Sequence, residues 1–148
     1  DQQFSKEDAV AIIMKFANNA IGSFVLSDRT PTPWNWEMAL GENAKFPKSE
    51  QNAIRFMGTK GSLEFPNLVL WSHSSADGNW QDEIFPEEIE TPFVDAYVAQ
   101  CQHLCAVVRG TQRPIIGAEN GTKSLEVTLA VIRAANEGTR VIIDHLLK

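Results

Sequence analysis

Residues 8–27 read DAVAIIMKFANNAIGSFVLS. In the first part, 8–16, apolar side chains fill odd and even positions alike, which is typical of a strand covered on both faces. Asn18 and Asn19 follow, and asparagine is one of the few residues that adopts the left-handed conformations of tight turns. A second apolar segment runs over 20–27. This stretch predicts an antiparallel β-hairpin.

Further strands are expected along the chain. Apolar alternation on both sides of the Gly-Thr-Lys-Gly turn at 58–61 predicts a second hairpin. Another strand is expected over 68–71, an edge strand near Trp80, and a last strand over 139–144. Between the two hairpins, residues 28–51 are polar, aromatic and broken by prolines, which predicts a long loop.

Two helices are expected after the strands. Pro92 suits the first position of a helix, and apolar residues then recur at helical spacing until Gly110. The second helix is expected over 118–137, with an apolar stripe, and Gly138 ends it. Strands followed by helices, with no β–α–β repetition, predict an α+β fold. We expect one domain over 1–148: an open, mainly antiparallel (mixed) sheet with the two long C-terminal helices packed on one face.

Composition excludes several classes of partner. The chain has 13 Lys and Arg against 19 Asp and Glu, a formal net charge of -6. Such a chain repels phosphate backbones, so we expect no nucleic-acid partner. No apolar run approaches the roughly 20 residues that span a bilayer, so we expect no membrane partner.

The two cysteines, Cys101 and Cys105, lie four residues apart in the first expected helix. Their side chains would leave one helix face nearly parallel, which favours packing over a disulfide. His103 would point away from both thiols, and a zinc site needs further ligands, so no metal site is expected. With so few cysteines, a cytoplasmic location is expected.

Other patterns do not meet the requirements of a catalytic site. The glycine-rich stretch 117–124 resembles a phosphate-binding loop, but Thr122 separates its second glycine from the lysine. It is interpreted as a helix N-terminus. No serine or cysteine nucleophile stands with a base, so no catalytic residue is assigned.

The long loop over 28–51 is the stretch whose residue types fit ligand binding. Arg29 and Glu37 can hydrogen-bond hydroxyls or carboxylates, while Trp34 and Trp36 offer flat apolar faces that suit a sugar ring. Long loops in compact domains are more often functional than idle. The alternative, equally weighted, is that the tryptophans plug the sheet or a subunit contact.

Five stretches follow one another in order: EDAVAIIMKFANNAIGSF at 7–24, PWNWE at 33–37, GTKGSLEFP at 58–66, QCQHLCAVVRG at 100–110 and SLEV at 124–127. Together they resemble the C-terminal domain of the Gfo/Idh/MocA oxidoreductase family. The PWNWE stretch is similar to one dehydrogenase-like branch of that family. The resemblance runs over nearly the whole chain.

The resemblance implies a two-domain enzyme. Its first domain is a Rossmann fold that binds NAD or NADP, and its second closes the substrate pocket. The implied reaction is hydride transfer between a nicotinamide and a carbon bearing a hydroxyl, typically on a sugar or polyol. The outer sheet face of the second domain commonly builds dimers or tetramers, so a homo-oligomer is expected.

The sequence lacks three of the family's motifs. It contains no Gly-x-Gly-x-x-Gly after a strand, no Glu-Lys-Pro, and no Gly-Gly…Asp…His motif. We therefore expect this chain to be most of the substrate and oligomerisation domain, with the Rossmann domain missing. By itself it should bind no cofactor and be inactive, because hydride chemistry needs both a base and a cofactor.

In the full enzyme, four residues are expected nearest the substrate. Arg29 would orient an oxygen, Glu37 would accept hydroxyl hydrogen bonds, and Trp34 and Trp36 would shape the pocket. The alternative is a non-catalytic assembly or carbohydrate-binding module with the same sheet architecture.

Overall fold

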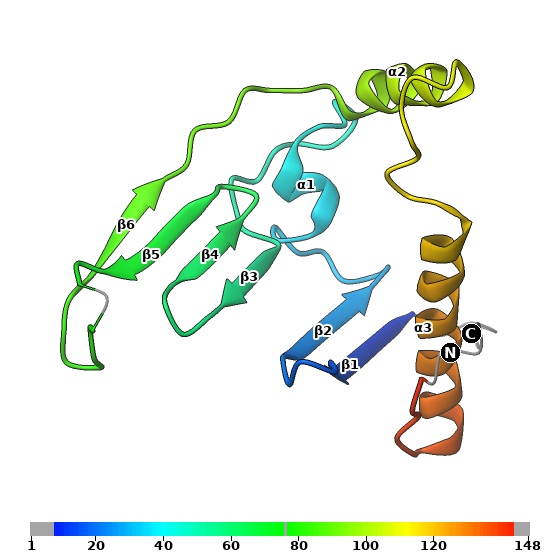
Figure 1. Ribbon diagram of the computed structural model, residues 1–148. Coiled ribbons are helices and arrows are strands. Elements are labelled where there is room, and N and C mark those ends of the chain that lie inside the picture. Colours follow the sequence, from blue (N-terminus) through cyan, green and yellow to red (C-terminus); the bar gives the residue numbers. More distant parts are fainter. Residues whose placement is uncertain (1–7, 76, 144–148) are drawn as a thin grey trace. The chain divides into compact units, whose positions relative to one another are not determined.

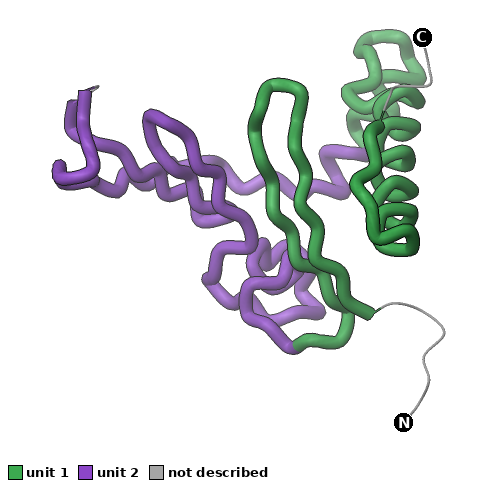
Figure 2. Tube along the Cα trace, turned by 90° about the horizontal axis from the view of Figure 1, so that it is seen from below, with its two compact units in different colours: residues 1–30, 101–148 green, residues 31–100 purple. Residues whose placement is uncertain are grey.

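A computed structural model describes residues 8–75 and 77–143. These residues form six strands and three helices (Figure 1). The chain divides into two compact units, one of residues 1–30 with 101–148 and the other of residues 31–100 (Figure 2).

The predicted first hairpin is confirmed. Strand β1 (Ala9–Lys15) pairs antiparallel with β2 (Ile21–Ser27), in a register that places Ile12 opposite Phe24. The turn differs from the prediction, because Asn19 alone adopts a left-handed conformation, with φ of 67°. Asn18 acts through its side chain instead, whose Oδ1 accepts the N–H of Ala20 at 3.1 Å.

One face of β1 is half-buried and the other is exposed. Val10, Ile12 and Met14 on β1 are half-buried, whereas Ile13 is 84% exposed and Val25, on the same face as Ile13, is 82% exposed. Cover on both faces was wrongly predicted for the described chain, because apolar composition shows what a face can bury and not what lies against it.

The second sheet has four antiparallel strands, β3 (Ile54–Met57), β4 (Ser62–Phe65), β5 (Val69–His73) and β6 (Ile84–Glu88), in that spatial order. The turn over 58–61 forms as predicted, with the N–H of Gly58 donating to the carbonyl of Gly61 at 2.9 Å. The register aligns one residue of each strand in a row across one face: Phe56, Leu63, Leu70 and Glu87.

Two strand predictions need correction. The edge strand is β6, which begins at Ile84, and Trp80 lies in the turn before it. Residues 139–143 are not a strand, and the remainder of that prediction, Asp144, lies outside the described residues. An isolated apolar segment forms a strand only when another strand pairs with it, and no described strand does so here.

All three helices have recognisable ends. The helix α3 (Ala118–Glu137) has the predicted bounds, and Gly138 after it is left-handed, with φ of 63°. The helix α2 (Ala96–Val108) begins four residues later than Pro92, because Oδ1 of Asp95 accepts the N–H of Val98 at 3.0 Å and acts as the N-cap. The third, α1 (Trp36–Leu40), lies within the stretch predicted as a loop.

The predicted α+β class is confirmed, with strands preceding the two longer helices. The described strands form two separate sheets. Within each sheet, every pair of neighbouring strands is antiparallel. The predicted stripe of α3, namely Leu125, Leu129 and Ile132, is more than half exposed. None of the described helices combines the length and apolar content that crossing a bilayer requires.

Candidate functional site

The expected binding loop is organised around the short helix α1. Asn35 precedes the helix and caps it, because its Oδ1 accepts the N–H of Met38 at 2.9 Å. The same side chain donates from Nδ2 to the carbonyl of Thr32 at 2.8 Å. One asparagine therefore joins the helix to the chain that carries Trp34.

Two backbone hydrogen bonds hold the C-terminal end of α1. Gly41 is left-handed, with φ of 67°, and its N–H donates to the carbonyl of Glu37 at 3.1 Å. Ser49 then donates its N–H to the carbonyl of Met38 at 2.9 Å. Ala39 is fully buried, and it is the one described residue of which this is true. The helix is short, but its caps and this anchor hold it in place.

The indole of Trp36 stacks on the ring of Phe65. The ring centroids are 5.6 Å apart and the planes are inclined by 28°, within the range of offset stacking. Trp36 is the first residue of α1 and Phe65 is the last residue of β4. The stack leaves Trp36 51% exposed, and Trp34 is 58% exposed, so both indoles can contact a ligand.

The carboxylate of Glu37 follows Trp36 in the first turn of α1. Its side chain is exposed, and among the described residues it has no hydrogen-bond or ion-pair partner. An unpartnered carboxylate can accept hydrogen bonds from hydroxyl groups. Trp34, Trp36 and Glu37 thus lie within one segment of the unit 31–100.

Arg29 belongs to the other unit, at the end of the first hairpin. Its Nη1 donates to Oδ2 of Asp8 at 3.0 Å, in an ion pair of two half-exposed side chains. Its N–H donates to Oγ of Ser27 at 3.3 Å. The structure therefore shows Arg29 joining the start of β1 to the end of β2.

Sequence reasoning missed two features of β4. The first is Phe65 itself, which was taken only as a strand residue. The second is a polar cluster around Glu64, whose Oε2 accepts from Nδ2 of Asn52 and whose Oε1 accepts from Nε of Arg55, each at 3.1 Å. The strand alternation could have placed Glu64 and Arg55 opposite each other, as they are in the register, but no sequence signal points to Asn52.

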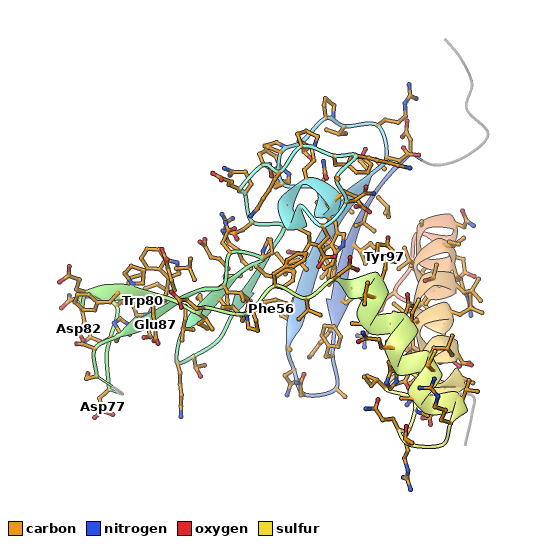
Figure 3. The ribbon with its side chains drawn as sticks, turned by 90° about the horizontal axis from the view of Figure 1, so that it is seen from above. Phe56, Asp77, Trp80, Asp82, Glu87 and Tyr97 are labelled. Carbon is orange, nitrogen blue, oxygen red and sulfur yellow. The ribbon has the colours of Figure 1, made fainter. Side chains whose placement is uncertain are left out.

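The connection between β5 and β6 holds another exposed indole. Trp80, labelled in Figure 3, is fully exposed and lies in a turn that side-chain hydrogen bonds stabilise. Oδ2 of Asp82 accepts the N–H of Asn79 at 2.8 Å, and Oδ1 of Asn79 accepts the N–H of Gln81 at 3.0 Å. Trp80 has no ring partner among the described residues, which makes it a useful contrast to Trp36.

The thiols lie elsewhere in the molecule. Cys101 and Cys105 are both free and exposed, so the expected packing of these side chains is wrong for the described chain. With Gln102 and Arg109 they line a shallow hollow of about 360 Å³ on α2. No group of three or more His, Cys, Asp or Glu gathers as a metal site within 8–75 and 77–143. None of the four predicted substrate residues lines this hollow.

Comparison with known proteins identifies the family. Residues 1–143 match the family model described as the oxidoreductase family, C-terminal alpha/beta domain. The match covers most of both compact units. No curated protein and no solved structure matches the chain. With nearly all of its length matched, the chain belongs to the Gfo/Idh/MocA oxidoreductase family as a C-terminal domain.

Proposed function

We propose that this chain is the substrate-binding and oligomerisation domain of an NAD(P)-dependent oxidoreductase that acts on a hydroxyl of a sugar, polyol or similar small molecule. Membership of an oxidoreductase family supports the enzyme association. The Rossmann domain that would hold the cofactor is the partner that this domain requires. The two free cysteines agree with the cytoplasmic location that forms part of the proposal.

The observation that carries the proposal is the stack of Trp36 on Phe65. It presents a fixed and half-exposed indole, and the unpartnered carboxylate of Glu37 follows it directly. Sugars and polyols expose both C–H faces and hydroxyl groups, so an indole and a carboxylate together match both kinds of surface. In this proposal Trp34 completes the apolar wall and Arg29 orients a substrate oxygen.

The described residues do not fit a dinucleotide. A Rossmann site places the pyrophosphate at a glycine-rich turn between a parallel strand and a helix. Here α3 follows a segment with no strand, and every described strand pairing is antiparallel. NAD or NADP would therefore be bound by the Rossmann domain of the complete enzyme, and the role of this chain is to bind and orient the substrate.

Substitutions at α1 in the complete oxidoreductase test the proposed site. We expect Trp36→Ala and Glu37→Gln each to lower kcat/KM by about tenfold or more, because each removes about 1.5 kcal/mol of substrate contact. Trp80→Ala and Glu90→Gln change the same residue types at exposed positions outside the site and should leave kcat/KM unchanged. Unchanged kcat/KM in both α1 variants would show that the substrate binds elsewhere.

The proposed oligomer would form through the four-stranded sheet. Phe56 and Met57 are neighbours in β3 and lie on opposite faces, yet they are 55% and 85% exposed. Apolar surface on both faces favours cover by a second copy. Sedimentation should show a dimer or larger species that Met57→Glu or Phe56→Glu dissociates, and a monomer at high concentration would contradict this part of the proposal.

A further inference from the structure

Hydrogen bonds hold the backbone of Phe65, the residue on which Trp36 stacks, on both sides. Phe65 pairs with Ile54 in the β3–β4 ladder, and its carbonyl accepts the N–H of Ala53 at 2.9 Å. Its neighbour Glu64 is held by Asn52 and Arg55. The ring of Phe65 is half-buried and its backbone is fixed on both sides.

The polar cluster continues past Phe65. Oδ1 of Asn52 accepts the N–H of Asn67 at 3.2 Å, and Nδ2 of Asn67 donates to the carbonyl of Glu50 at 2.9 Å. These bonds tie the chain that enters β3 to the chain that leaves β4. Phe65 lies between the tied points, so the position of its backbone, from which the ring extends, is fixed.

The caps of α1 hold the backbone of Trp36, but no cap holds its side chain. It opens a five-residue helix, and short helices have little intrinsic stability. About half of its side chain faces solvent, and Phe65 is its one aromatic partner among the described residues. Without Phe65, the indole would sample more rotamers, and ordering them on ligand binding would cost free energy.

We infer that Phe65 is a positioning residue for the substrate site: it fixes the plane of the Trp36 indole on which a sugar-like ring stacks. This inference rests on the proposed function. Phe65 acts through Trp36 and does not itself contact the substrate. Its removal should therefore weaken substrate binding without altering the chemical step.

Steady-state kinetics of the complete oxidoreductase test the inference. Aromatic stacking of this kind corresponds to about a threefold to tenfold change in affinity, so Phe65→Leu should raise KM by that factor and leave kcat within about twofold. Phe65→Tyr keeps the ring and should restore KM. Phe24→Leu is the matched control, because Phe24 is also a strand residue, lies in the other sheet and has no ring partner among the described residues.

Coupling between the two rings gives a second measurement. If Phe65 acts only through Trp36, the variant with both Trp36→Leu and Phe65→Leu should have the KM of Trp36→Leu alone. The indole N–H proton resonance of Trp36 should also move in Phe65→Leu, since the ring that faces it is gone. If Phe65→Leu does not fold, Phe65→Met, which also removes the ring and has a similar volume, replaces it in the same measurements with the same expected rise of KM.

The outcomes separate this inference from the proposed function. If Trp36→Leu raises KM and Phe65→Leu raises it no more than Phe24→Leu does, the positioning role is wrong and the proposed site stands. If Trp36→Leu leaves KM unchanged, the proposed site is wrong and the positioning role falls with it. An equal rise of KM in Phe65→Tyr and Phe65→Leu would also overturn the role, because the tyrosine keeps the stack on Trp36.

Discussion

Nη1 of Arg29 lies 3.0 Å from Oδ2 of Asp8, and this ion pair joins the two ends of the first hairpin. The side chains are 52% and 47% exposed, so water and salt screen their attraction. Arg29 is also one of the four residues proposed to contact the substrate. The structure shows the first role, and the second can be separated from it by experiment.

Arg29→Gln and Asp8→Asn distinguish these two roles. Each should lower the free energy of unfolding by at most about 0.5 kcal/mol, as for other exposed ion pairs. In the complete oxidoreductase, Arg29→Gln alone should raise KM, by about tenfold for one lost charged hydrogen bond. If Asp8→Asn raises KM equally, Arg29 serves the hairpin and does not bind the substrate.

Glu64 should contribute measurably to stability. Its side chain is 25% exposed, and its loss leaves Nδ2 of Asn52 and Nε of Arg55 without their acceptor. We expect Glu64→Ala to lower the free energy of unfolding by about 1–3 kcal/mol, and Glu64→Gln by less, because an amide oxygen still accepts one bond. Urea denaturation measures the change. Glu87→Gln, at an exposed carboxylate without a partner in the described chain, should have no effect.

Substitution by alanine should change the free energy of unfolding in opposite directions at Gly121, inside α3, and at Gly138, which follows it. Gly121 lies inside the helix with open space where a Cβ would stand, so Gly121→Ala should raise the free energy of unfolding by about 0.5–1 kcal/mol. Gly138 also has open space, but its φ is 63°, so Gly138→Ala should lower stability by about 1–2 kcal/mol. Thermal unfolding of the two variants measures both changes, and a shift of the same sign would contradict the described helix end.

The side chain of His103 should stabilise the connection between α2 and α3 through hydrogen bonds to Gln112 and Ile115. The N–H of Ile115 donates to its Nε2 at 3.3 Å, so the neutral ring carries its proton on Nδ1, which donates to Oε1 of Gln112 at 2.8 Å. His103→Ala should speed hydrogen exchange at the Ile115 amide by about fivefold, the equivalent of one hydrogen bond. Gln102→Ala, at the adjacent exposed residue, should leave that exchange rate unchanged.

Local patterns predicted the elements whose signals lie within a few residues. The hairpin of 8–27, the turn at 58–61 and the bounds of α3 all depend on neighbouring residues and short-range periodicity. The start of α2 was predicted at Pro92, whereas the structure caps the helix with Asp95, a residue that is also typical of a helix start. The helix α1 also had a signal, with Asn35 before it and Gly41 after it, but five residues are too few for a periodic pattern.

The candidate site was predicted only in part. Composition pointed to Trp34, Trp36 and Glu37, since aromatic and acidic side chains in a long loop suit ligands. It could not point to Phe65 or Asn52, because alternation along β4 says which face Phe65 takes and nothing about the ring that lies against it. The same limit applies to 139–143, where apolar residues were expected to form a strand and found no partner strand.

By itself, the sequence determined where β1, β2 and α3 form and which side chains are available for a ligand, because turns, caps and periodicity act between near neighbours. Only the tertiary structure decided that Trp36 rests on Phe65, 29 residues later along the chain, and that Glu64 gathers Asn52 and Arg55. Such contacts depend on how strands pair and where a loop folds back, and those outcomes are set by packing between distant segments.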